Sequence, residues 1–405
     1  MLTYNQIKKI YSWNLPKIIF GIGAVGEVGV EARQFGKKAL ILTGENISKA
    51  GLVDEVMKPL KKEGVEVDVF SHSHTHGAEP DLEEIDLVIE AARKNEYELF
   101  IGVGGGSCMD MAKLASIMTT NPGGIQQYLS VGETLHRDDL VKKPGPPIVL
   151  VNTTHEAGGE IGHAIILHTK KRKVYVKSPY AVPKVAIIDP MLTVTLPRSV
   201  TAATCLDALA TAIETYTTIY NTPLSDVLSL FSIKLVSDNL AIAYGDGRNI
   251  EARYNLSLAG HIAGLANYSV GASHLIHAFS HAIGGMWGIT HGFACSVTMP
   301  YILNTITKMI PKPRLVRLAK AFGENPERLT KNEIASRIVM ATKRLNEDVN
   351  SPGCLKDVGA KKNELPEMVK QALDWKHYID RSPWKLTYDD AIKLAERIWE
   401  GIILV

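Results

Sequence analysis

FIGVGGGS, at residues 100–107, is an apolar run that passes directly into three consecutive glycines and a serine. Asp110 and Lys113 follow it in a segment with the composition of a helix. Glycines let the backbone approach an anion closely, and the first N–H groups of a helix favour negative charge. These residues therefore predict a strand, a phosphate-binding turn, and a helix that begins with Asp110 and Lys113. The alternative is a tight turn that binds nothing.

Short apolar segments rich in β-branched residues alternate with amphipathic ones on both sides of this turn, from Lys17 to about Pro197. The pattern predicts strands at residues 17–20, 39–43, 65–70, 99–103, 148–151 and 185–188, and helices at 51–63, 82–95 and 108–118. Strands separated by helices usually pair in parallel through right-handed crossovers. The first half is therefore expected to be an α/β dinucleotide-binding domain with a parallel sheet.

The second half has a different pattern, with helical periodicity and almost no strand signal. Helices are predicted at residues 199–220, 223–243 and 250–266. Pro197 interrupts helices and favours turns, so it is a plausible boundary. The prediction is an α/β domain at residues 1–197 followed by an all-α domain at residues 198–405.

The first complete strand of the α/β pattern ends at Gly44, which is followed by Glu45. An acidic residue at such a strand end can accept a hydrogen bond from a ribose 2'-hydroxyl, whereas a glycine leaves room for a 2'-phosphate. Gly44 thus favours NADP over NAD. Because Glu45 is adjacent, both cofactors stay open.

Histidines are concentrated in residues 273–292, which hold four of the thirteen in the chain. His277 and His281 are four residues apart and share one face of a helix. His291 lies beyond a glycine pair, where the chain can return towards that face. Neutral imidazoles that converge with a carboxylate bind divalent metals. The alternative is that these histidines are ordinary core or surface residues.

The carboxylate candidate is Asp207, which interrupts the apolar segment at residues 203–214. Glu214 is the competing choice, and Asp207 could instead cap a helix. A histidine run at residues 71–76 is more readily explained as a solvated loop than as a second metal site.

Composition excludes several classes of function. The 45 basic and 43 acidic residues leave a net charge of +2, too small to indicate a nucleic-acid or anionic-membrane partner. We find no signal peptide and no apolar run long enough for a membrane span, so a cytoplasmic location is expected. The four cysteines contain no CxxC pair and are expected to be thiols.

Together these residues resemble the iron-dependent, or group III, alcohol dehydrogenases, a superfamily that also includes glycerol dehydrogenase and dehydroquinate synthase. The similarity covers nearly the whole chain, and the spacing of 291 − 277 = 14 residues matches the family's paired histidine ligands. The motifs that carry it are FGIG at 20–23, the turn at 104–113, TNPG at 120–123, TT at 153–154, VAIIDP at 185–190, LTVTLP at 192–197, DAL at 207–209, the segment 277–285, and HG at 291–292.

The resemblance implies a role for each of these groups. Asp207, His277 and His291 would bind one divalent metal, iron or zinc, and His281 would lie near the substrate on the proton path. The cofactor, NAD or NADP, would be bound in a cleft between two domains; its candidate residues are Gly44, Gly105, Gly106, Ser107, Asp110, Thr153, Thr154 and Lys173. The implied reaction is hydride transfer between this cofactor and a small alcohol or aldehyde. A homo-oligomer, with a dimer favoured, is implied as well.

Two departures from the family pattern leave alternatives open. Thr211 stands where the family has a fourth ligand, a histidine, and the loop usually written TTAGTGSE reads TTHEAGGE at residues 153–160. Either the remaining three ligands hold a metal with open positions, or the metal is lost and His155, His163 or His281 supplies the acid chemistry. His155 or Glu156 could also replace the missing ligand.

Rival functions follow from the same departures. The chain could be a metal-free reductase or a transhydrogenase of this superfamily that never releases its cofactor. A dehydroquinate synthase-like lyase is disfavoured, because the sequence shows no basic pocket for a phosphorylated sugar acid. A non-catalytic nucleotide-binding relative is the rival of another class.

Overall fold

The computed structural model describes residues 13–72, 82–130, 140–169, 172–271 and 273–403. The histidine run at residues 71–76 lies largely outside them. The chain divides into two compact units: an α/β unit of Asn14–Thr154 and Gly159–Thr195, and a helical unit that includes His155–Gly158 and Leu196–Val405. The α/β unit ends at Thr195, close to the predicted boundary at residue 197. The inclusion of the four-residue segment His155–Gly158 in the helical unit was not predicted.

A six-stranded sheet with the order β1-β8-β5-β4-β2-β3 forms the centre of the α/β unit, and every neighbouring pair is parallel. This confirms the predicted parallel sheet. The strands are β1 (Lys17–Phe20), β2 (Lys38–Gly44), β3 (Glu66–His72), β4 (Leu99–Gly104), β5 (Ile148–Asn152) and β8 (Val185–Ile188).

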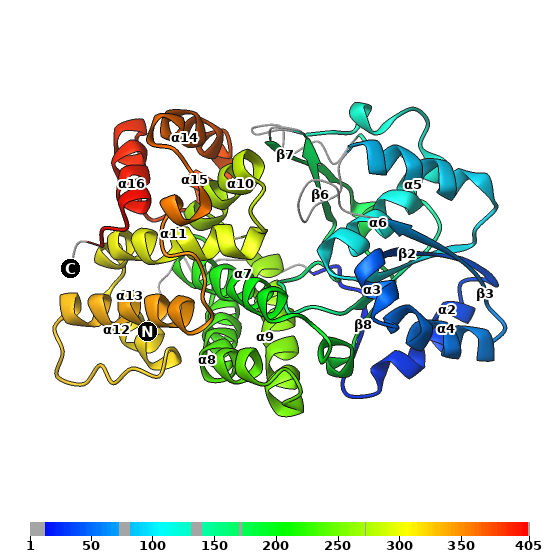
Figure 1. The fold of residues 1–405 in the computed structure, drawn as a ribbon, viewed down its shortest axis with the longest axis horizontal. Helices are drawn as coiled ribbons and strands as arrows, with labels where there is room; N and C mark the ends of the chain where they lie inside the picture. Colours follow the sequence, from blue (N-terminus) through cyan, green and yellow to red (C-terminus); the bar gives the residue numbers. More distant parts are fainter. Residues whose placement is uncertain (1–12, 73–81, 131–139, 170–171, 272, 404–405) are drawn as a thin grey trace. The chain divides into compact units, whose positions relative to one another are not determined.

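Helices cover both faces of this sheet (Figure 1). Successive side chains of a strand point to opposite faces, so Ile41 packs in one apolar core with α2 (Val28–Arg33) and α4 (Leu52–Lys62). Leu42 packs in the other core with α5 (Leu82–Lys94) and α6 (Gly106–Thr120). The unit also contains α3 (Glu45–Lys49) and the 3-10 helices η1 (Ala24–Glu27), η2 (Ile125–Gln127), η4 (Pro179–Ala181) and η5 (Pro190–Thr193).

A separate antiparallel ribbon of β6 (Ala164–Thr169) and β7 (Arg172–Lys177) was not predicted. Its buried side chains, among them Ile165, Leu167 and Val174, join the core formed by α5 and α6. The ribbon is only six residues long in each strand, and an isolated two-stranded ribbon is marginal in water. It is therefore stabilised by this packing, which a local sequence pattern does not reveal.

The helical unit confirms the predicted all-α second half, and residues 196–403, as far as they are described, contain no strand. The helices are α7 (Arg198–Thr217), α8 (Pro223–Gly245), α9 (Ile250–Val270), α10 (Leu275–Trp287), α11 (His291–Ile306), α12 (Lys312–Ala321), α13 (Lys331–Asp348), α14 (Leu365–Leu373), α15 (Lys376–Ile379) and α16 (Tyr388–Glu400), with 3-10 helices η6 (Thr307–Met309), η7 (Leu355–Val358) and η8 (Lys362–Glu364).

Helix α8 is long and apolar enough, by length and composition alone, to cross a membrane, contrary to the expectation that no segment would be. Core helices of soluble proteins pass the same test, and α8 is the one helix that passes it among the residues that the structure describes. Its buried residues, such as Ile233 and Val236, join the core shared with α7 and α9. On its outer side Lys234 pairs with Asp238. The exposed side also carries large apolar residues such as Val227 and Phe231, so the helix is apolar around much of its circumference while its buried side packs in the core.

Candidate metal centre and cofactor turn

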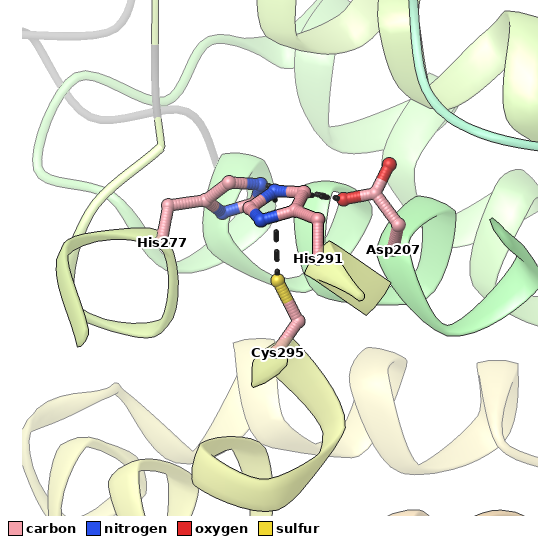
Figure 2. Close-up of side chains that lie close together, drawn as sticks. All are labelled: Asp207, His277, His291 and Cys295. Atoms are coloured by element: carbon pink, nitrogen blue, oxygen red, sulfur yellow. Dashed lines mark hydrogen bonds and ion pairs between the residues drawn. The ribbon is translucent and has the colours of Figure 1, made fainter. Parts of the chain in front are cut away.

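Three helices of the helical unit bring the predicted metal ligands together. Asp207 lies in α7, His277 near the start of α10, and His291 at the first position of α11. One potential ligand atom from each of them, together with the thiol of Cys295, lies within 4.8 Å of all the others (Figure 2). Cys295 was not predicted, and the signal that could have identified it is its spacing of four residues from His291 on one helix.

Gly292 explains how α11 approaches α7 closely enough to form this cluster. A Cβ atom at Gly292 would lie 1.7 Å from the carbonyl oxygen of Ala203, which is backbone and cannot move aside cheaply. Only glycine fits this contact. The adjacent His291 consequently places its Nε2 atom 3.4 Å from Oδ1 of Asp207.

The other distances show a group of donors that face one point. Nε2 of His277 lies 3.6 Å from Oδ1 of Asp207, and Sγ of Cys295 lies 3.8 Å from Nε2 of His291. Thr211, one turn after Asp207 on α7, places its Oγ1 atom 3.5 Å from Nε2 of His277. Thr211 thus also points into the cluster.

Glu214 supports the cluster from behind and is not one of its members. Its buried carboxylate accepts hydrogen bonds from the backbone N–H groups of His274 (2.8 Å) and Ile276 (2.5 Å), and it contacts Nδ1 of His277 at 2.6 Å. Burial opposes its ionisation, but the neighbouring imidazoles and N–H donors outweigh burial and hold the pKa of Glu214 below its ordinary value. A carboxylate that holds Nδ1–H leaves Nε2 of His277 to face the cluster, as in histidines that bind metals.

The electrostatics of the cluster favour a positive charge at its centre. Burial by itself would lower the pKa of His277, but the carboxylates of Glu214 and Asp207 outweigh it and raise the pKa to about 9. In the protein without metal, the imidazole therefore carries a proton at neutral pH. A divalent cation would satisfy the same carboxylates, so the residues present fit a metal site.

The loop His155–Gly158 holds the second oxygen of the Asp207 carboxylate. The backbone N–H of Ala157 donates to Oδ2 of Asp207 at 3.2 Å. The loop lies against two glycines of α9, because a Cβ at Gly260 would lie 2.3 Å from the carbonyl oxygen of His155 and one at Gly264 would lie 2.4 Å from Cα of Gly158. These glycines fix the orientation of Asp207 through the loop.

His155 anchors this loop and does not join the metal cluster. Its Nε2 atom contacts the guanidinium of buried Arg253 at 3.1 Å, and its Nδ1 atom lies 3.3 Å from Oγ of Ser257. Burial, and secondarily the positive charge of Arg253, lower its pKa to about 3. His155 is therefore neutral at physiological pH. Its geometry argues against the alternatives that made it a replacement ligand or a proton donor.

His281 lies in a stack of aromatic rings beside the cluster. Its ring centroid is 5.1 Å from that of His291, 4.4 Å from that of Trp375 and 5.7 Å from that of Tyr378. The residue is buried. The indole of Trp375 is also buried and packs against the ring of His281.

In the α/β unit, the glycine-rich turn leads from β4 into α6 at the carboxyl edge of the sheet. Gly104 has φ +147°, and a Cβ there would lie 2.4 Å from Sγ of Cys108, so glycine is required. Gly105 is the N-cap of α6, and no side chain caps that helix. The N–H groups of Gly106 and Ser107 thus lie at a helix N-terminus of the kind that binds phosphate.

The neighbouring strands complete this edge. Strand β4 lies between β2 and β5. Gly44 is the last residue of β2. Thr153 follows β5, and its N–H donates to the carbonyl of Gly104 at 3.1 Å. The buried Oγ1 atom of Thr153 has no hydrogen-bond partner among the described residues, as expected of a group that meets a ligand. Thr154 instead donates its hydroxyl to Asn152.

Asp110 and Lys173 occupy more internal positions. Asp110 accepts from Nζ of buried Lys113 at 3.0 Å and from the backbone N–H of Ile166 at 2.8 Å, so it fastens α6 to strand β6. Lys173 is a buried residue of β7, opposite His168 on β6. Both remain predictions as cofactor residues, and for Asp110 a supporting position fits the geometry better than direct contact.

Comparison with known proteins decides the family. The model of the iron-containing alcohol dehydrogenases matches residues 16–190, and that of their C-terminal domain matches residues 201–399. The chain belongs to the iron-containing alcohol dehydrogenase family. As a member of that family it is an oxidoreductase that transfers a hydride between a nicotinamide cofactor and an alcohol or aldehyde.

Individual relatives of this alcohol dehydrogenase span almost its whole length. The long-chain-alcohol dehydrogenase 1 of Geobacillus thermodenitrificans is 34% identical over 385 residues, 95% of each chain, and the NAD-dependent methanol dehydrogenase of Bacillus methanolicus is 32% identical over 366 residues, 89% of this chain and 92% of the relative. A crystal structure of a 1,3-propanediol oxidoreductase shares the fold with a TM-score of 0.88 and 29% identity, over 96% of this chain and 100% of that one.

Proposed function

We propose that this protein is an NAD(P)-dependent alcohol dehydrogenase, or aldehyde reductase, in which Asp207, His277 and His291 hold one divalent metal ion. The observation that carries the proposal is that these three side chains, from three different helices, converge on one point. The two carboxylates next to His277 favour a positive charge there. When bound, the metal supplies Lewis acidity at the substrate oxygen, and the nicotinamide supplies or accepts the hydride.

The chain's own residues have separate tasks in this proposal. Glu214 holds the proton on Nδ1 of His277, and Ala157 holds Asp207, so that the ligand atoms are oriented before a metal binds. The turn at Gly105, Gly106 and Ser107 binds the cofactor phosphates, with Thr153 and Thr154 on the next strand, while Asp110 and Lys173 support it. His281 moves the substrate's proton at a ring nitrogen.

For the cofactor we propose NADP in preference to NAD. Gly44 presents no side chain at the strand end next to the phosphate-binding turn, and the carboxylate of Glu45 is engaged with Lys49 at 3.0 Å along α3. We also propose a small alcohol or aldehyde as the substrate, a cytoplasmic location and a homodimer. An exposed apolar row of α8, Leu224, Val227 and Phe231, supports the dimer, because a second copy would cover it.

The experiment is a steady-state assay with a panel of aldehydes, with NADPH and NADH, before and after removal of metal by a chelator. Net cofactor oxidation that is lost on metal removal and restored by zinc or iron is expected. Net oxidation that survives metal removal would favour the metal-free reductase. Turnover only with a second alcohol-carbonyl pair would identify a transhydrogenase, and tight cofactor binding without turnover would identify a non-catalytic relative.

The substitution Gly44→Asp tests the cofactor preference in the same assay. A carboxylate placed there would repel the 2'-phosphate, so kcat/KM for NADPH is expected to fall by about tenfold or more while that for NADH falls less or rises. Gly26→Asp is the matched control, since it adds the same charge at an exposed residue of η1 in this unit, with open space around its Cβ position and no positive φ. A parallel loss with both cofactors would refute the preference.

A further inference from the structure

We propose that Cys295 is a fourth protein ligand of the metal. Its thiolate would take the place of the histidine ligand for which Thr211 is substituted. This inference rests on the proposed function, because it assumes a metal at Asp207, His277 and His291. Sγ of Cys295 lies within 4.8 Å of the ligand atoms of all three residues and is 3.8 Å from Nε2 of His291.

Helix α11 places the two donors on the same side. Residues four apart on a helix project from one face, so His291 and Cys295 both point from α11 towards Asp207 on α7 (Figure 2). Cys295 is fully buried, and all four cysteines of the chain are thiols. A second ligand from α11 therefore requires no rearrangement of the backbone.

The donor separations are those of a small tetrahedral site. With metal–nitrogen and metal–oxygen distances of about 2.0–2.2 Å and a zinc–sulfur distance of about 2.3 Å, neighbouring ligands of a tetrahedron are roughly 3.3–3.7 Å apart. The separations around Asp207 are 3.4 Å to His291 and 3.6 Å to His277, and Cys295 is 3.8 Å from His291. The other three separations do not exceed 4.8 Å, so binding of a tetrahedral cation requires side-chain movements of about an ångström.

Thr211 is a poor metal ligand, so a strong fourth ligand has to come from another residue. Its hydroxyl points at the cluster, 3.5 Å from Nε2 of His277, but a neutral hydroxyl is a weak donor compared with imidazole or thiolate. Cys295 supplies a stronger donor from the neighbouring helix. The metal–sulfur bond forms as the thiol releases its proton to solvent.

This donor set strengthens the preference of the site for zinc over iron(II). One carboxylate and one thiolate neutralise a divalent cation, and a thiolate is a soft ligand that selects zinc over metals suited to oxygen and nitrogen donors. We therefore expect zinc to be bound more tightly than iron(II). The inference goes beyond the family, whose name refers to iron.

The experiment is to strip the purified full-length protein with a chelator, reload it with cobalt(II) or zinc(II), and examine the metal directly. The cobalt protein is expected to show a thiolate-to-cobalt charge-transfer band in the near ultraviolet. The zinc protein is expected to show one sulfur neighbour at about 2.3 Å by X-ray absorption. In Cys295→Ser both signals disappear, and zinc affinity falls by at least about tenfold to a hundredfold, the effect of losing even an outer partner.

Two further variants separate a ligand from a merely structural cysteine. Cys354→Ser, at a half-buried cysteine of η7's N-cap, is the control and keeps the sulfur signals. The double substitution Cys295→Ser with Thr211→His is expected to restore tight zinc binding without a sulfur neighbour. Bound metal with only nitrogen and oxygen neighbours in the unsubstituted protein would overturn the cysteine ligand and leave the proposed function intact. No metal binding at all would overturn both.

Discussion

Two buried histidines of the helical unit, His277 and His155, have opposite electrostatic surroundings. His277 lies between the carboxylates of Glu214 and Asp207, and its pKa is raised to about 9. His155 faces the guanidinium of Arg253, and its pKa is lowered to about 3. Both rings are buried, so burial does not distinguish the proposed metal ligand from the structural anchor. The sign of the neighbouring charge does.

The strongest test of this comparison is His277→Ala, set against His155→Gln. Removal of His277 takes away a ligand and leaves two carboxylates without a cation, so bound metal should fall to near zero and turnover by at least about a hundredfold, since a Lewis acid contributes several kcal/mol. His155→Gln should keep metal and turnover close to normal. Elemental mass spectrometry measures the bound metal, and a steady-state assay measures turnover. Equal losses in the two variants would contradict the proposed difference between His277 and His155.

His281 adds a third buried histidine, packed against aromatic rings. His281→Ala should lower kcat by about a hundredfold, the lower range for loss of a proton-transferring group, and should alter its pH profile. Cofactor affinity, measured by fluorescence titration, should stay nearly unchanged, and metal should be retained. An unaltered rate would remove His281 from the proton path.

Glu214→Gln removes one of the two negative charges next to His277 without removing a proposed metal ligand. The amide lacks the charge that holds Nδ1–H of His277, so metal affinity should fall by about tenfold to a hundredfold, as for other outer partners of histidine ligands. Competition with a chromophoric chelator measures this, and excess metal should restore most of the turnover. Asp238→Asn on the exposed side of α8 serves as the control. Undiminished affinity would show that Glu214 only caps α10.

The smallest expected effect concerns the pH dependence of stability at His155. Its pKa is about 3 in the folded protein and 6.5 in its unperturbed state, so below pH 6.5 the unfolded chain takes up a proton that the folded one does not. Stability contributed by this group is therefore complete above pH 6.5 and is lost as pH falls towards 3. Between pH 7.5 and 5.5 the loss is about 1.4 kcal/mol.

His155→Gln should abolish that part of the pH dependence, because glutamine can accept from Arg253 but does not titrate in this range. Urea unfolding of both proteins at pH 7.5 and 5.5 measures the difference, and all other titrating groups cancel in it. Parallel pH profiles would mean that the pKa of His155 is the same in the folded and unfolded states. Arg253 would then not exclude a cation from this position.

Much of the fold follows from local patterns. All six parallel strands were predicted within two residues of their bounds, since a buried parallel strand is a continuous apolar run. The β6–β7 ribbon was missed because its stability comes from packing on the core of α5 and α6. In the site, the residue types and the spacing of His277 and His291 were sufficient to predict a ligand set, whereas Cys295 was not singled out.

By itself, then, the sequence determined the α/β and helical halves and the glycine-rich turn, and it singled out the histidines proposed as metal ligands, because periodicity, glycine content and residue chemistry are local properties. Only the tertiary structure placed Glu214 against His277 and Cys295 beside the cluster. It also placed Arg253 against His155, where the positive charge of the guanidinium disfavours a bound cation. These relations join residues that are far apart in the sequence, and they depend on close backbone contacts such as that of Gly292 with Ala203. Charge and proximity act through space, so no local pattern contains them.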